Sequence, residues 1–192
     1  MAIPTPVIPS FTDGTVVHQA DLNALASNLT NLYNYNQGAF NSQRPACMAV
    51  QTVTQGVANS TATLVNFNSA PVNVGNMWVG SQPTQITIQI AGIYYLFGQV
   101  RYPADASGTL GIVCRGNIMI NGTNPATNSV SNTDVPFPTV GNGPTAAAWF
   151  VSNLAAGAVV YLDTLHNAGA GINTSLLYGG SFLSAFFVAA PT

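Results

Sequence analysis

The sequence predicts a mainly β protein, an antiparallel β-sandwich that follows an extended arm and a short α-helix. Three observations lead to this fold class. The first residues contain several prolines, and a leucine pattern with helical spacing follows them. From residue 46 onward the chain consists of short apolar runs separated by turn residues. Many short strands without a helical period are typical of a sandwich or a barrel.

The first segment, residues 1–18, is predicted to be an extended arm. Pro4, Pro6 and Pro9 favour polyproline geometry and exclude a helix. The arm has no periodic apolar face, so we expect it to add little to a domain core. It also lacks the basic and apolar regions of a signal peptide, so secretion is not expected. The apolar residues that can anchor it to another surface are Ile3, Val7, Ile8 and Phe11.

The second segment, residues 19–36, is predicted to be a helix with a coiled-coil seam. Its leucines follow the 3-4-3 spacing of a and d positions. Two heptads make a marginal helix in water, so the seam needs a partner. The helix either packs on its own domain or gathers several chains about an axis, and the narrow stripe favours the second reading. The seam leucines are Leu22, Leu25, Leu29 and Leu32, and residues 37–45 form the linker that follows.

Residues 46–192 are predicted to form the β domain, which we call the head. Ile86, Ile88 and Ile90 alternate with polar residues, as in a strand with one wet face. Asn121 and Gly122 predict a tight turn, because both residues tolerate positive φ. Further strands are expected at 48–54, 63–67, 93–100, 146–153, 159–165 and 176–188.

The closing strand is apolar on both faces. Phe182 and Phe186 point one way, while Leu183 and Phe187 point the other. A strand of this kind must be covered on both sides. One side can face the core of the sandwich, and the other most simply meets another copy of the chain.

The charge content excludes two classes of partner. Only 4% of the residues are charged, where about 25% is usual. Three arginines cannot neutralise a row of phosphates or an anionic lipid surface, so nucleic-acid binding and electrostatic membrane binding are excluded. The most apolar stretch, residues 176–190, is too short for a bilayer span and is interrupted by Gly and Ser. Membrane insertion is therefore not expected.

The residues of catalytic chemistry are scarce, and we expect no enzyme, no metal and no cofactor. Glutamate and lysine are absent. Asp163 and His166 lie near the end of one strand without a nucleophile motif. Cys47 and Cys114 are expected to be buried free thiols rather than a disulfide. Exposed aromatic residues could stack on sugar rings, but most aromatic residues are expected to fill the core or the space between subunits.

Several segments of the head resemble the complement/tumour-necrosis-factor-like jelly rolls. An alternating strand runs into Gly92-Ile93-Tyr94-Tyr95 and Phe97, which is similar to the signature of that family. The segments 154–162 and 180–186 are similar to two later strands, although Ala158 replaces a usual aspartate. The resemblance covers about residues 46–190. It implies a ten-stranded jelly roll that assembles as a homotrimer, with the closing strand, including Phe182 and Phe186, near the three-fold axis.

The front of the chain resembles the N-terminal segment of tailed-bacteriophage virion proteins. Residues 11–25, Phe-Thr-Asp-Gly-Thr-Val-Val-His-Gln-Ala-Asp-Leu-Asn-Ala-Leu, carry this resemblance, although His18 and Gln19 replace the usual threonine before the helix. Proteins of this type are tail-fibre, minor tail and head-decoration proteins.

The two resemblances imply a non-enzymatic structural protein on the virion surface. Its arm attaches to capsid or tail proteins, its helix gathers three chains and its head is displayed, after assembly in the host cytoplasm. Host adhesion, including binding to a surface glycan, and capsid decoration both remain open as the outer role. The rival expectation is a free carbohydrate-binding module with the same fold.

Overall fold

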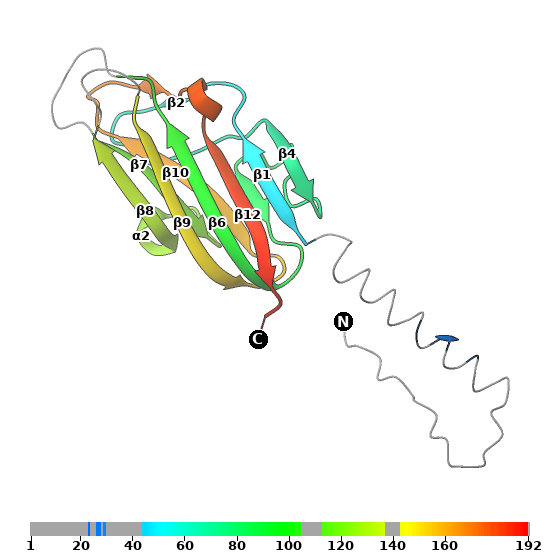
Figure 1. Cartoon of the computed structure of the whole chain (residues 1–192). Coiled ribbons are helices and arrows are strands. Elements are labelled where there is room, and N and C mark those ends of the chain that lie inside the picture. The colour runs from blue at the N-terminus through cyan, green and yellow to red at the C-terminus, as the bar shows by residue number, and fades with distance from the viewer. Residues whose placement is uncertain are drawn as a thin grey trace, which may run out of the picture. The chain divides into compact units, whose positions relative to one another are not determined.

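The computed structural model describes residues 44–104, 113–136 and 143–191, together with four positions nearer the N-terminus. The chain divides into two compact units, Met1–Gln43 and Arg44–Thr192. In the first unit, the four described residues are helical and exposed: Asn23, Ala26, Ser27 and Leu29. The second unit is the head, a sandwich of antiparallel sheets (Figure 1).

The first sheet has five strands in the order β4-β1-β12-β6-β9. Every neighbouring pair is antiparallel. The closing strand β12 therefore lies in the middle of the sheet, between β1 and β6. The strands are β1 (Ala46–Val50), β4 (Ser69–Val74), β6 (Gly92–Arg101), β9 (Thr145–Leu154) and β12 (Phe182–Ala189).

The second sheet has the order β3-β10-β7-β8, and β5 also pairs with β10. Its strands are β3 (Thr63–Leu64), β5 (Gln85–Thr87), β7 (Val113–Ile120), β8 (Ser129–Pro136) and β10 (Val159–His166). Three short elements complete the head: the pair β2 (Gly56–Val57) and β11 (Ile172–Asn173), the single-turn helix α2 (Pro125–Asn128), and the 3₁₀ turn η1 (Leu177–Gly179). An antiparallel β-sandwich is the fold class that the sequence predicts, and the structure confirms it.

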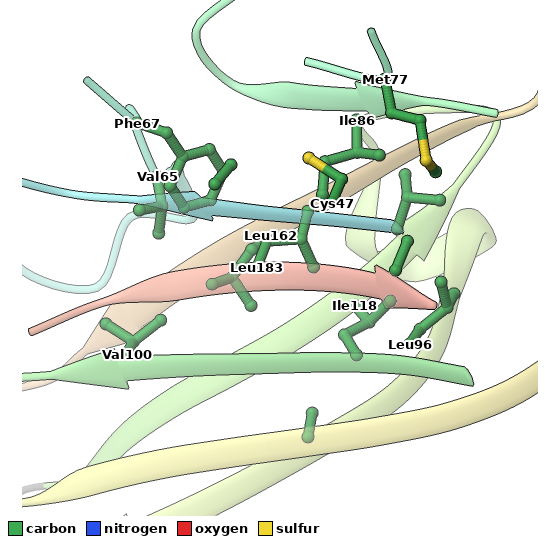
Figure 2. Close-up of a cluster of buried hydrophobic side chains, with 14 of the residues drawn as sticks. Cys47, Val65, Phe67, Met77, Ile86, Leu96, Val100, Ile118, Leu162 and Leu183 are labelled. Atoms are coloured by element: carbon green, nitrogen blue, oxygen red, sulfur yellow. The ribbon is translucent and has the colours of Figure 1, made fainter. Parts of the chain in front are cut away.

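The core lies between the two sheets and is aliphatic with a few aromatic rings. The alternation of strand residues produces this core. In β6, for example, Tyr94, Leu96 and Val100 lie on the same side of the strand and are fully buried. From the opposite sheet, Ile118 and Leu162 point toward the same cluster (Figure 2). Burying side chains of this size contributes about 1.5–3 kcal/mol each relative to leaving them in water.

Glycine brings the two sheets close together at one position on β7. A Cβ atom on Gly116 would lie 2.8 Å from the carbonyl oxygen of Ala146, which belongs to β9 of the other sheet. A backbone atom cannot move aside as a flexible side chain can. Gly116 therefore sets the spacing of the sandwich at this point.

The closing strand confirms the two-faced pattern but starts later than predicted. Leu176 and Leu177 are exposed in the turn before β12. Within β12, Leu183 is buried, whereas Phe186 and Val188 face outward. The segment from 176 could not be a strand throughout, because Gly179 and Gly180 both have positive φ and turn the chain.

Three other predicted strands are shorter in the structure, and the one expected at 63–67 is β3, which ends at Leu64. β1 ends at Val50 rather than at residue 54, because Gln51 and the residues after it leave the sheet as a loop. The alternating strand from residue 85 is only three residues long, and Ile90 is exposed.

The tight turn predicted at Asn121 and Gly122 is a longer connection. Asn121 has the expected positive φ of 56°. A helical turn then follows, because Pro125 starts it and the side chain of Asn124 accepts a hydrogen bond from the Ala126 amide at 3.0 Å. The cap and the proline together override the turn signal of the Asn-Gly pair.

Candidate interaction surface

The outer face of the first sheet is covered by apolar side chains across all five strands. Residues directly opposite one another in an antiparallel sheet lie on the same face, so the strand register assigns each face. One outer row contains Val74, Ala46, Phe186, Tyr95 and Val151, and the next contains Val72, Met48, Ser184, Phe97 and Trp149. Nine of these ten side chains are apolar or aromatic, which is why we call this face the apolar face.

The large side chains of the apolar face are exposed in the single chain. Trp149 is 63% exposed, Val151 50% and Phe186 39%. Val188, also on β12, is 51% exposed. Single exposed apolar residues are common on soluble proteins, whereas contiguous apolar patches mark interaction sites.

The aromatic residues of the apolar face support one another. The ring centroids of Phe97 and Phe182 lie 5.5 Å apart. Both rings stand on neighbouring strands that are hydrogen-bonded along their length. The surface is therefore held by the sheet itself and does not depend on a loop.

Two of the predicted interface residues lie on this face, namely Phe182 and Phe186. Leu29, in the predicted helical seam, is helical and 58% exposed. The other predicted positions lie outside the described residues: Leu22, Leu25 and Leu32 of the seam, and Ile3, Val7, Ile8 and Phe11 of the arm.

The structure adds residues that sequence reasoning did not place on this surface. In the single chain Trp149 faces outward. It stands opposite Phe97 in the register of β6 and β9. Parity places Tyr95 and Phe97 on one side of β6 and Tyr94 and Leu96 on the other, but both sides are apolar, so the sequence alone does not say which side faces outward.

The outer face of the second sheet has a different chemistry. It carries the ion pair Arg115–Asp134, with nitrogen–oxygen distances of 2.6 and 2.9 Å. Asn132 and Tyr161 lie on the same face. The Arg115 guanidinium holds the pKa of Asp134 below its ordinary value by hydrogen bonding to the carboxylate. This face is suited to water.

The residues that could carry catalysis are not brought together. Asp163 points to the outer face of the second sheet, whereas His166 is buried on the core side of the same strand. Both ring nitrogens of His166 form hydrogen bonds within the head. Nε2 lies 2.9 Å from the Val57 carbonyl oxygen, and Nδ1 accepts a hydrogen bond from the Ala168 amide at 3.3 Å. The pair therefore does not form an acid–base couple.

The thiols are inert where they lie. Cys47 and Cys114 are both buried and free, and burial raises the pKa of each thiol to about 12. A thiol of this kind is protonated at neutral pH and does not act as a nucleophile or metal ligand.

Within the described parts of the chain, no group of three or more His, Cys, Asp or Glu side chains could hold a metal ion. The helices described there include none with the length and apolarity of a membrane span.

Comparison with solved structures assigns the architecture. Murine APRIL at pH 5.0 matches with a TM-score of 0.55 and 15% identity, covering 76% of this chain and 100% of that chain. Eiger TNF from S. frugiperda matches with a TM-score of 0.54 and 12% identity, covering 78% of this chain and 96% of that chain. The head has the tumour-necrosis-factor-like jelly-roll fold. No protein-family model matches the sequence, and a search of curated proteins gives no match.

Proposed function

We propose that this chain is a non-enzymatic structural protein of a tailed-phage virion. In this proposal three heads pack through their apolar faces, the leucine helix gathers the chains, and the N-terminal arm attaches the trimer to capsid or tail proteins. The head is displayed on the virion surface, where it serves in capsid decoration or in adhesion to the host. The observation that carries the proposal is the apolar face, which a free monomer would leave in water.

A second copy of the chain suits the apolar face as a partner. The face spans five strands, from Val72 and Val74 on β4 to Trp149 and Val151 on β9. Its two central rows carry no charge, so it offers little to a charged partner. Obligate interfaces between copies are apolar in the same way, resembling a protein core cut in half.

A closed three-fold assembly needs two different patches on each copy, because its interface is head-to-tail. The two ends of the apolar face can supply them, with Trp149 and Val151 of β9 at one end and Val72 and Val74 of β4 at the other. Two further observations favour three copies: the leucine seam and the resemblance to trimeric jelly rolls.

The position of the tether agrees with outward display. The chain enters the head beside its C-terminal strand, because the Phe187 amide donates a hydrogen bond to the Pro45 carbonyl at 3.0 Å. The loop after β1 and the turn before β12 meet at the opposite end, where the Gln51 amide donates to the Ser181 carbonyl at 2.9 Å. Figure 1 shows these two ends of the head. One end is therefore tethered, and the other is free to face outward.

Attachment is tested by deleting residues 2–12. The arm contains no part of the described head, so the deleted protein should remain a soluble, folded trimer that no longer joins virions. Co-sedimentation with purified particles measures incorporation, and light scattering measures the trimer. A matched control replaces Pro4 and Pro6 by Ala, which keeps the apolar anchors. Incorporation of the deleted protein at parental occupancy would place attachment in the helix or the head.

A free carbohydrate-binding module is the second candidate, and the exposure of Trp149 favours it. An exposed indole ring on a rigid sheet can stack on a sugar. The two candidates predict different environments for this residue. In the trimer Trp149 is shielded from a fluorescence quencher without any ligand, whereas in a free module it is shielded only when a glycan is added.

A further inference from the structure

Asp163 is a buried carboxyl group on an outward-facing side of the head. It lies on β10, between Leu64 of β3 and Asn117 of β7 in the strand register. Only 3% of its surface is exposed, and Asn117 is 1% exposed. The neighbouring positions on this face, such as Arg115, remain in contact with water. Asp163 has therefore lost the hydration that a surface aspartate keeps.

The hydrogen bonds of Asp163 do not replace that water. Asn117 bonds to the carboxyl group, and its own Oδ1 accepts a hydrogen bond from Ser129 Oγ at 2.5 Å. The amide nitrogen of Asn117 is then the group left to donate to Asp163. The second carboxylate oxygen, Oδ1 of Asp163, is buried without a hydrogen-bond partner. An ionised carboxylate in this position is poorly compensated.

Among the described residues, no ion pair joins Asp163 to a cation. The cation whose charge acts on it is Arg115, two residues from Asn117 on β7, and the hydrogen bonds of that guanidinium go to Asp134 of β8. β3 contributes only Thr63 and Leu64 to the pairing and so brings no charge. Cys114 and His166 lie on the core side of their strands, where the thiol is neutral. Tyr102, whose pKa is raised mainly by burial and further by Asp163, is neutral as well.

We propose that Asp163 is an acid-responsive lock, whose carboxyl group takes up a proton in mildly acidic solution and thereby stabilises the second sheet of the head. The proton removes the buried charge. Burial raises the pKa of Asp163 to about 6, with the Asn117 hydrogen bond and the Arg115 charge lowering it by less.

The direction of the effect follows from linkage. The folded head binds the proton more tightly than the unfolded chain, in which an aspartate has a pKa of about 3.9. The stabilisation is therefore complete below about pH 4 and is lost as the pH rises through about 6. A pKa of about 6 in the folded head against about 3.9 in the unfolded chain corresponds to a change on the order of 100-fold in the folding equilibrium between the fully protonated and the fully ionised carboxyl group.

This inference does not depend on the proposed trimer, because Asp163 lies on the sheet opposite the apolar face. The test compares the urea unfolding of the full-length protein and its Asp163→Asn variant between pH 4.5 and 7.5. Asparagine has the shape of aspartate but no charge at any pH. We expect the parent to lose about 25-fold in its folding constant across this range relative to Asp163→Asn, because part of the effect lies below pH 4.5. Asp13→Asn, which removes a carboxylate outside the head and leaves the Arg115–Asp134 pair intact, is the matched control and should keep the parental dependence on pH.

An identical pH dependence in the parent and in Asp163→Asn would overturn the proposal. If Asp163→Asn fails to fold, carboxyl ¹³C chemical shifts of the parent give the titration directly. A midpoint for Asp163 near 6 supports the lock, and a midpoint near 4 contradicts it. Light scattering on the same samples reports the trimer separately, so failure of one proposal is distinguishable from failure of the other.

Discussion

The two outer faces of the sandwich are built from strands of similar length but from different residues. On the first sheet, the position opposite Phe97 is Trp149, and the position opposite Tyr95 is Val151. On the second sheet, the position opposite Arg115 is Asp134, and the position opposite Asn117 is Asn132. Both sheets share one core, so packing of the core does not explain this difference. The exposed side chains of the first face are large and apolar, whereas those of the second face include an ion pair.

The comparison also separates stability from assembly. β12 contributes to both, because Leu183 enters the core while Phe186, three residues later, enters the apolar face. A substitution on one side of this strand should therefore change the unfolding of the head, and a substitution on the other side should change its association.

The largest effect is expected from Phe186→Ala. If the ring is fully buried in the assembly, its loss costs about 3–5 kcal/mol per site, and the loss occurs once in every copy. We expect the trimer to dissociate at much higher protein concentration than the parent, as measured by analytical ultracentrifugation. Leu183→Ala is the matched variant on the same strand, and it should lower the unfolding free energy of the head by about 2–5 kcal/mol. Equal heat resistance of the Phe186→Ala and parental trimers would show that β12 is misplaced in the assembly.

A smaller effect is expected from Gly116→Ala, which tests the contact between the two sheets. The added methyl group meets the backbone oxygen of Ala146 at 2.8 Å, and overpacking of this kind costs about 1–3 kcal/mol. Chemical denaturation of the head measures the loss. Gly157→Ala is not a clean control because its φ is 88°, whereas Gly56→Ala meets only a side-chain oxygen at 3.4 Å. A loss for Gly116→Ala no greater than that for Gly56→Ala would contradict the close approach.

The smallest effect is expected from Arg115→Gln on the polar face. The ion pair is about half exposed, with side-chain exposures of 40% and 46%, and exposed pairs contribute about 0–1 kcal/mol. The loss should shrink further in high salt, because the charges are screened. A loss above about 2 kcal/mol would mean that this face is shielded from water, contrary to the comparison.

The sequence predicted the alternating strands well and the exposed surfaces less well. Some strands are apolar or aromatic at every position, so they show no alternation. Examples are residues 94–97 of β6 and residues 146–151 of β9. Periodicity cannot say which side of such a strand faces out. The pairing of β6 with β12 and β9, and the packing of the second sheet against one side of them, decide it, and those strands are distant in sequence.

Asp163 shows the same limit for the buried polar site. Its sequence neighbours suggested only a weak relation to His166. Its actual environment comes from Asn117 and Leu64, which lie 46 and 99 residues earlier in the chain. The prediction of a tight turn at Asn121 and Gly122 fails for a more local reason. The Asn124 cap and Pro125 start a helical turn just after the Asn-Gly pair.

The most direct test of the central claim is the native mass of the full-length protein and two charge variants. Phe186→Asp places a charge on the apolar face, and Asn132→Asp places the same charge on the exposed polar face. At micromolar concentration, we predict three times the chain mass of 19.9 kDa for the parent and for Asn132→Asp, and a single chain mass for Phe186→Asp. A monomeric parent, or a Phe186→Asp variant that stays trimeric, would contradict the assignment of the apolar face as the interface.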